Sequence, residues 1–291
     1  MNRFLPLALG LTLLPGFAAA APRVIPGFAT PESVLIDGDR RYVSNIGATL
    51  DPLAKDGDGF ISSLGADGTL IDRHAFPADG TTLDAPKGMA ITGGRLYVAD
   101  IDRVIGFDIA TGIRGFEASL PAGGPSLAND LAATGDGALL LSDTLRGAVY
   151  RLDPATRGWT LLTDAIPGAN GIVYDAATRA ALVAGLGADF SGGDLYTLPE
   201  GGPARRVEGG PHGILDGLAR LPDGRLLVSD WIALSPPTPG RLLLLRPDGT
   251  DPTPLDLGIP ILGPADFGAA ADGTLWIPAT LGDAVVVAPP S

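Results

Sequence analysis

Six segments of the 291-residue chain share one pattern, and this repeat constrains the fold more than any other feature of the sequence. Each segment begins with a polar residue, often followed by Gly. A short apolar run, a tight turn and a second apolar strand come next. The leading positions are spaced by 55, 42, 41, 46 and 49 residues, and they are Glu32, Lys87, Asn129, Asn170, Asp216 and, in the sixth copy, Ala265.

Each repeat then continues with a third apolar segment, as in residues 103–112 and 147–158, and with a weaker fourth one. Turns of the D-G, T-G or G-G type, which favour hairpins, follow most of the third segments. Four short strands in about 40–50 residues are typical of one blade of a β-propeller. The sequence therefore predicts an all-β, six-bladed β-propeller with four-stranded blades.

The two ends of the chain complement each other in this repeat. The sixth copy stops after its third strand, GDAVVVA, whereas residues 22–30 form an extra strand pattern before the first copy. Pairing these two segments would complete the last blade and hide an open sheet edge. We therefore expect the N-terminal strand to close the ring. A β-sandwich is the alternative fold, but it does not require six copies of one unit.

Composition agrees with a turn-rich, packed chain. It contains 42 Gly and 27 Pro residues, yet 45% of its residues are hydrophobic, which argues against both disorder and a helical bundle. The net charge of −13 disfavours binding to nucleic acid or to an anionic membrane surface. There is no Cys, so disulfides, thiolate nucleophiles and iron–sulfur clusters are excluded.

Residues 1–20 have the pattern of a secretory signal peptide. Arg3 precedes an apolar run over residues 4–14, and a small-residue tract ending in Ala18-Ala19-Ala20 follows. We expect cleavage before Ala21, so that residues 21–291 form the propeller domain of an exported protein, periplasmic or secreted. No other stretch approaches about 18 uninterrupted apolar residues, so no membrane span is expected in the mature protein. The sequence leaves the oligomeric state open.

The leading polar residues begin the innermost strand of each blade, which lines the central channel. Long loops on the same face, over residues 45–58, 186–193 and 231–239, mark it as the functional side. Four of the leading residues offer hard oxygen donors, which suit Ca²⁺, or Mg²⁺ with more retained water. Zn²⁺ is disfavoured because it prefers nitrogen and sulfur ligands. A turn-forming role is the alternative for any one of these residues alone. The four are Glu32, Asn129, Asn170 and Asp216.

With these motifs in place, the register resembles that of the regucalcin/gluconolactonase family, to which the paraoxonases are related. The matching segments are PESV, ANDLA, ANGIV and LDGLA, in the order Glu, Asn, Asn, Asp. The resemblance covers the chain from about residue 30 to its end. It implies a divalent cation at the channel mouth, Ca²⁺ foremost with Mg²⁺, Mn²⁺ or Zn²⁺ as alternatives, bound by Glu32, Asn129, Asn170 and Asp216.

The resemblance also implies hydrolysis of a lactone or related ester, with Asp216 moving the proton. His212, four residues before Asp216, is a second candidate for the base, and a loop histidine on the rim is its alternative role. Lys87 departs from the family pattern; it either holds a substrate carboxylate or oxyanion or balances the neighbouring acids. Asp130 lies beside the ring, and Trp231 is suited to form a pocket wall.

Other catalytic classes find no support in the sequence. It contains no G-x-S-x-G elbow, no H-E-x-x-H, no Walker A loop and no G-x-G-x-x-G after a strand. Two functions of different classes are therefore carried forward. One is a metal-dependent lactonase acting on a small-molecule lactone or ester. The other is a non-enzymatic, NHL-like propeller that binds a ligand or a protein partner.

Overall fold

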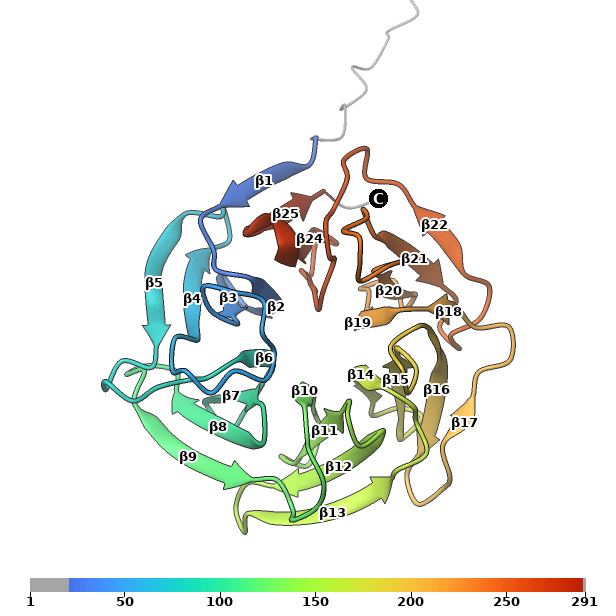
Figure 1. Cartoon of the computed structure of the whole chain (residues 1–291), viewed down its shortest axis with the longest axis horizontal. Helices are drawn as coiled ribbons and strands as arrows, with labels where there is room; N and C mark the ends of the chain where they lie inside the picture. The colour runs from blue at the N-terminus through green and yellow to red at the C-terminus, as the bar shows by residue number, and fades with distance from the viewer. Residues whose placement is uncertain (1–20, 290–291) are drawn as a thin grey trace, which may run out of the picture.

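Six antiparallel sheets surround a central axis like the blades of a propeller (Figure 1). The computed structural model describes residues 21–289, and the predicted signal peptide lies outside this range. Each blade runs outward from the channel through strands that we term A, B, C and D. The prediction of a six-bladed β-propeller is confirmed, and the β-sandwich alternative is excluded.

The strands of the first three blades follow the predicted repeat. Blade 1 comprises β2 (Pro31–Asp37), β3 (Arg40–Asn45), β4 (Phe60–Gly65) and β5 (Leu70–Phe76). Blade 2 comprises β6 (Pro86–Thr92), β7 (Arg95–Asp100), β8 (Arg103–Asp108) and β9 (Arg114–Ser119). Blade 3 comprises β10 (Ala128–Ala133), β11 (Leu139–Asp143), β12 (Ala148–Asp153) and β13 (Gly158–Thr163).

The later blades have shorter outer strands. Blade 4 comprises β14 (Ala169–Asp175), β15 (Ala180–Gly185), β16 (Gly193–Pro199) and β17 (Arg205–Arg206), with β18 (His212–Gly213) also paired to β16. Blade 5 comprises β19 (Leu215–Arg220), β20 (Leu226–Asp230), β21 (Arg241–Leu245) and β22 (Thr253–Leu255). Blade 6 comprises β23 (Gly268–Ala269), β24 (Leu275–Ala279), β25 (Ala284–Ala288) and β1 (Arg23–Pro26), with one 3₁₀ turn, η1 (Thr280–Gly282), before β25.

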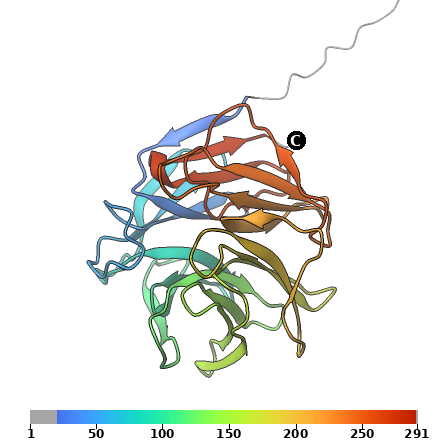
Figure 2. The same ribbon diagram turned by 45° about the vertical axis from the view of Figure 1, so that its right-hand side comes forward.

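Ring closure occurs as the sequence predicts. β1 pairs antiparallel with β25, with Arg23 opposite Val287, and the two strands lie side by side in both views (Figures 1 and 2). Trp276 on β24 is covered by two guanidinium groups, from Arg23 at 5.9 Å and Arg41 at 5.1 Å. Cation–π contacts of this kind join the first strand of the chain to the last blade.

Apolar side chains on facing sheets fill the space between neighbouring blades. One cluster joins blades 1 and 2 and includes Phe76, Leu96 and Phe107; another joins blades 5 and 6 and includes Leu227, Phe267 and Ile277. The A–B turns of blades 3 and 5 are tight. They contain Gly137 and Gly224, whose φ values of 89° and 88° are unfavourable for residues with a side chain. This packing makes the ring a rigid support for the channel. No helix among the described residues is long and apolar enough to cross a membrane.

Candidate functional site

The polar residues at the channel mouth are positioned by a bulge that recurs in the innermost strands. In blades 1 to 5 the register between strands A and B shifts at the leading residue, as between Pro31 and Ser33 or between Leu215 and Leu218. A bulge re-aims side chains and leaves a backbone group without a ladder partner. In three blades a Ser on strand B supplies that partner: Ser44 Oγ accepts from Ser33 N–H, Ser142 Oγ from Asp130 N–H and Ser229 Oγ from Gly217 N–H.

In four blades, a polar residue at the end of strand B fixes the chain just before strand A. Asn45, Asp100, Asp143 and Asp230 end strand B in blades 1, 2, 3 and 5, and each accepts a backbone N–H just before strand A. Asp100 Oδ1, for example, accepts from Ala85 N–H at 2.8 Å. These strand-end residues therefore have a structural role, because they fix the chain where it enters strand A.

Glycines after the leading residue let adjacent innermost strands approach closely. A Cβ atom on Gly88 would lie 2.1 Å from Asp130 Oδ1, and one on Gly171 would lie 2.2 Å from the carbonyl oxygen of Asp216. On Gly217 it would lie 2.6 Å from the carbonyl oxygen of Ala265. These positions keep the ring of polar residues narrow, which explains the Lys-Gly, Asn-Gly and Asp-Gly pairs of the repeat.

The structure buries all five leading polar residues around the mouth of the channel. Their relative exposures are 2–8%, and they are Glu32, Lys87, Asn129, Asn170 and Asp216. Burial is the main cause that raises the pKa of Glu32 well above its usual range, followed by the charges of Asp216 and Asp266, whereas Lys87 lowers it. Glu32 and Asp216, on blades 1 and 5, therefore interact electrostatically, whereas their sharing of one cation stays a prediction.

Asp216 is held by an aromatic neighbour. The Trp231 indole Nε1–H donates to Asp216 Oδ2 at 2.7 Å, and both side chains are buried. Burial raises the pKa of Asp216 to about 7, and the charge of Asp266 adds to this effect. Hydrogen bonding from Trp231 and Asn170 acts in the opposite direction. Trp231 was predicted to form a pocket wall, and in the structure its polar atom positions Asp216.

Lys87 is buried with its ammonium group bonded to backbone carbonyls. Nζ donates to Ala85 O at 2.7 Å and to Pro52 O at 3.0 Å. Burial lowers the pKa of Lys87 to about 8, while Glu32 foremost among the nearby acids raises it. Pro52 belongs to the long loop between β3 and β4, which projects at the left of Figure 2, so Lys87 ties this loop to the mouth.

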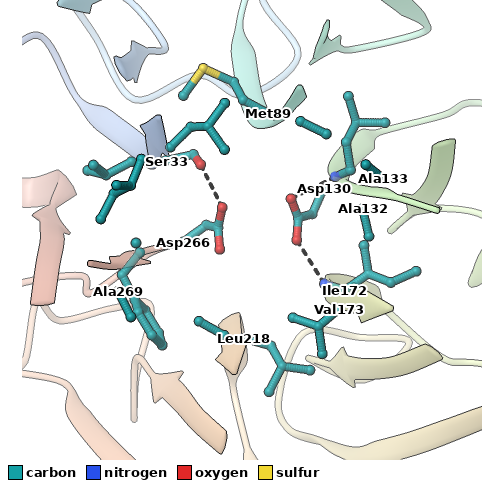
Figure 3. A pocket seen from close by; sticks show the side chains of 18 of the residues that line it. Ser33, Met89, Asp130, Ala132, Ala133, Ile172, Val173, Leu218, Asp266 and Ala269 are labelled. Atoms are coloured by element: carbon teal, nitrogen blue, oxygen red, sulfur yellow. Dashed lines mark hydrogen bonds between the residues drawn. The ribbon is translucent and has the colours of Figure 1, made fainter. Parts of the chain in front are cut away.

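A second layer of carboxylates lies one residue further along the channel. Asp130 on blade 3 and Asp266 on blade 6 point toward one another across the channel (Figure 3). Asp130 Oδ2 accepts from Ile172 N–H at 2.8 Å, and Asp266 Oδ2 accepts from Ser33 Oγ at 2.6 Å. Burial raises the pKa of Asp266 to about 7 and that of Asp130 well above its usual range.

These two carboxylates line a channel cavity of about 470 Å³. Its other lining residues lie further along the innermost strands, so the cavity opens toward the A–B turns, on the face opposite the long loops. Asp130, predicted to contact substrate beside the mouth, therefore faces this cavity. Asp266 was not among the predicted site residues, although it occupies the same repeat position as Asp130.

The structure does not bring His212 to the ring. It lies on β18, its side chain is 67% exposed, and Nδ1 lies 3.0 Å from Asp194 Oδ1 on β16. Residues that flank the site in sequence can point outward when they belong to a different strand. His212 lies on a surface strand and Asp216, four positions later, on a channel strand, which their spacing alone does not indicate.

Two of the predicted ligand oxygens lack a partner. Among the described residues, Glu32 Oε2 and Asn170 Oδ1 are buried and have no hydrogen-bond partner. Unpaired buried polar oxygens are costly, and a cation satisfies them. Residues 21–289 contain no group of three or more His, Cys, Asp or Glu side chains arranged to hold a metal ion. The predicted set combines two acidic side chains with two amides, and its four oxygen donors fit a hard cation.

Comparisons with known proteins agree on the fold. No family model and no curated protein matches the chain. Among solved structures, virginiamycin B lyase from Staphylococcus aureus is 13% identical with a TM-score of 0.60, and the match covers 93% of this chain and 100% of that one. Hydrazine synthase from Kuenenia stuttgartiensis is 13% identical with a TM-score of 0.60, covering 91% and 77%. At such identity the likeness supports the propeller fold, and the resemblance to regucalcin stays a prediction.

Proposed function

We propose that this six-bladed propeller is a divalent-metal-dependent hydrolase of lactones or related esters, of the regucalcin/gluconolactonase type. The observation that carries the proposal is the pair of buried, unpartnered oxygens, Glu32 Oε2 and Asn170 Oδ1, among the described residues at the channel mouth. They belong to the set of four predicted ligands. Both are hard oxygen donors of the kind that Ca²⁺ prefers.

The ligands proposed for the cation come from four different blades, and they are Glu32, Asn129, Asn170 and Asp216. Ca²⁺ suits the set best, because all four donors are oxygens and the chain has no Cys; Mg²⁺, Mn²⁺ and Zn²⁺ are alternatives. Such an ion, when bound, polarises a substrate carbonyl and stabilises the charge that develops on its oxygen. The mutual repulsion of the buried acids supports the same assignment, since a cation offsets it.

Asp216 is the proposed base. Its Oδ2 is fixed by Trp231 at 2.7 Å, so the carboxylate has one orientation. Burial raises the pKa of Asp216 to about 7 in the metal-free protein, and a bound cation would lower it, so the carboxylate of the loaded enzyme would be ionised near neutral pH and able to accept a proton from an attacking water. His212 is less suited to this role, because its ring nitrogen contacts Asp194 at the surface.

Lys87 has two proposed roles, and its contacts favour charge balance over substrate binding. Two of its three donors are used by the carbonyls of Ala85 and Pro52. The loop that contains Pro52 then acts as a lid over the mouth. Substrate reaches Asp216 when this loop moves, because the ring residues are nearly fully buried.

Hydrolysis assays on metal-stripped protein test this function. The protein is treated with a chelator, and cleavage of simple lactones and aryl esters is followed with and without Ca²⁺, Mg²⁺, Mn²⁺ or Zn²⁺. We expect turnover that depends on one of these ions and is reduced at least 100-fold in Asp216→Ala. Asp136→Ala, on an exposed A–B turn, is the control and should retain activity. Metal-independent turnover, or turnover unchanged in Asp216→Ala, would refute the proposal.

A non-enzymatic binding propeller is the second candidate function. The observation in its favour is the 470 Å³ channel cavity, which opens on the face opposite the predicted metal ring. A binding protein needs no dedicated base. If wild type shows no turnover with any lactone or ester, and ligand or partner binding is unchanged in Asp216→Ala, the binding function is supported instead.

Export is part of the proposal, and it depends on residues 1–20. Their Arg3, apolar run and small-residue tract support a cleaved signal peptide. Expression of the full chain in a bacterium with fractionation tests it. We expect the protein in the periplasm or medium, with Ala21 as its first residue. Retention of residues 1–20 in the cytoplasm would contradict export.

A further inference from the structure

Two segments on the mouth face run side by side between blades 5 and 6, and we term them the apolar rim: residues 231–240 and 257–265. Gly240 N–H donates to Ile261 O at 2.9 Å, and Pro239 and Leu262 form an isolated antiparallel bridge. The first segment connects β20 to β21, and the second leads into blade 6. They therefore form one continuous surface beside the channel mouth.

The apolar rim differs from the rest of the molecule in charge. Its sequences, WIALSPPTPG and LGIPILGPA, contain no charged residue, although the whole chain carries a net charge of −13. Ile232 and Leu234 are each 47% exposed and Leu262 is 36% exposed. Among residues 21–289, half of the twelve exposed large apolar side chains lie on loops of the mouth face, whereas Ile113 alone lies on a turn of the opposite face. Concentration on one face distinguishes this surface from scattered exposed leucines.

The backbone holds one of these side chains outward under strain. Ile232 has φ 64°, a left-handed conformation that is unfavourable for a β-branched residue. Asp230 Oδ1 fixes it by accepting from Ile232 N–H at 2.9 Å. An Asn or Gly would adopt this conformation with less strain, yet the position presents an aliphatic side chain to solvent. Strain of this kind is concentrated at sites that bind ligands.

The apolar rim is also joined to the proposed catalytic group. Trp231, its first residue, donates to Asp216 and lies against Gly263, where an added Cβ would be 2.9 Å from the indole ring. Beside the rim lies a cavity of about 220 Å³. Leu257, Ile259 and Ile261 are among the mostly apolar residues that line it, and Arg241 and Asp256 are the charged ones. An apolar surface thus begins at the residue that orients Asp216 and continues outward.

We propose that the apolar rim holds an aliphatic chain of the substrate, so that the substrate class is a lactone or ester bearing an alkyl or acyl substituent. This inference rests on the proposed hydrolase function. A sugar lactone needs several hydrogen-bonding partners, whereas the rim offers two hydroxyls, and Thr238 Oγ1 already donates to Pro236 O. A neutral alkyl chain matches a surface that is apolar and uncharged within an acidic protein.

Binding of non-hydrolysable lactams measures this preference independently of turnover. The probes are 5-hexyl- and 5-methyl-2-pyrrolidinone, amide analogues of γ-lactones that differ by five methylene groups. Each methylene removed from water tightens binding up to about fourfold, and partial burial reduces this to about twofold. We expect the hexyl probe to bind at least tenfold more tightly than the methyl probe. The matched γ-alkyl lactones should show the same trend in kcat/KM.

The rim variant is the triple substitution Ile232→Asn, Leu234→Ser and Leu262→Ser. Asn tolerates the left-handed conformation at position 232, so the loop keeps its shape. We expect this variant to bind both probes within twofold of each other, because the hexyl probe loses the apolar surface that holds its chain. The control Leu70→Ser, Ile71→Ser, Ile113→Ser removes three equally exposed aliphatic side chains away from the mouth and should behave as wild type.

The two proposals fail in different ways. Lactone turnover without a chain-length effect, or a chain-length effect retained in the rim variant, overturns the role of the rim and leaves the hydrolase function standing. Tight, rim-dependent binding of the hexyl probe without any turnover supports the rim and refutes the hydrolase. Rim-dependent binding to neutral phosphatidylcholine vesicles, or rim-dependent dimerisation, without a preference for the hexyl probe assigns the surface to a membrane or a second copy and overturns the proposal.

Discussion

The indole of Trp231 donates a 2.7 Å hydrogen bond to Oδ2 of Asp216, and it does so from the residue that follows strand B of the same blade. The donor stabilises the charged carboxylate and so opposes burial and the charge of Asp266, which leave the pKa of Asp216 raised to about 7. Trp231 thus fixes the orientation of the proposed base and lowers its pKa.

Substitution Trp231→Phe tests this relationship. Loss of the N–H removes a bond to a charged group, a contribution of about 1.5–3 kcal/mol, so the pKa of Asp216 rises. We expect the acidic limb of the pH–rate profile to move upward by about one unit. Trp159→Phe, on the outer strand of blade 3, is the control and should leave the profile unchanged. An unmoved limb in Trp231→Phe would mean that the indole does not tune Asp216.

Stability of the metal-free protein should fall as pH rises. The pKa values of Asp216 and Asp266 are about 7 in the folded chain against a usual 3.8, so the folded state binds more protons between these values. Ionisation of either group therefore destabilises the folded state, and the free energy of unfolding decreases as pH increases from about 4 to about 7. Calorimetric Tm measurements in chelator at pH 5 to 8 would record this decline.

Added Ca²⁺ should oppose that decline. A ligand that binds the folded state raises Tm, and the gain should be larger at pH 8 than at pH 5, because protons compete for the carboxylates. In Asp266→Asn the metal-free Tm should depend less on pH. A Tm that rises between pH 5 and pH 8 without metal would contradict the assigned pKa directions.

The close approach of innermost strands predicts a glycine requirement. In Gly217→Ala the new Cβ would lie 2.6 Å from the carbonyl oxygen of Ala265, a backbone atom that cannot rotate away. We expect a loss of about 2–3 kcal/mol in the free energy of unfolding, measured by urea denaturation. Gly135→Ala, where nothing lies within 4 Å, is the matched control and should change stability by less than about 0.5 kcal/mol. Equal effects at the two positions would show that the strands can separate.

Lys87 should hold the loop between β3 and β4. In Lys87→Met the carbonyls of Ala85 and Pro52 lose their donor, and the pKa of Glu32 rises further because a cation that lowers it is gone. Hydrogen–deuterium exchange over residues 46–59 should become several-fold faster. Arg225→Met, on the A–B turn of blade 5, should leave exchange in this loop unchanged. Unaltered exchange in Lys87→Met would show that Lys87 does not hold this loop.

The repeat made most of the fold predictable from the sequence. Leading residues such as Asn129 and Asp216 recur in register, and residues 22–30 complement the shortened last repeat, so blade number and ring closure could be read directly. Blade number and ring closure could be predicted because each depends on short strand and turn patterns that are local in the sequence. The pairing of β1 with β25 confirms them.

The directions of individual side chains could not be predicted in this way. A six-bladed ring places blades 3 and 6 opposite each other, but the repeat does not indicate that the carboxylates of Asp130 and Asp266, 136 positions apart in the chain, point toward one another. Trp231 contacts Asp216 through a loop whose path no repeat specifies. His212 illustrates the converse, since proximity in sequence to Asp216 gave it a candidate role, whereas pairing of β18 with β16 turns it to the surface.

Titration calorimetry of chelator-stripped protein with Ca²⁺ tests the central claim most directly, namely that Glu32, Asn129, Asn170 and Asp216 share one cation. We predict one Ca²⁺ per chain with proton release, and at least tenfold weaker binding in Asn170→Leu and in Glu32→Gln. Asp136→Asn, on a surface turn, should bind as wild type. Absence of binding by Ca²⁺, Mg²⁺, Mn²⁺ and Zn²⁺, or binding that both ring variants retain unchanged, would contradict the account.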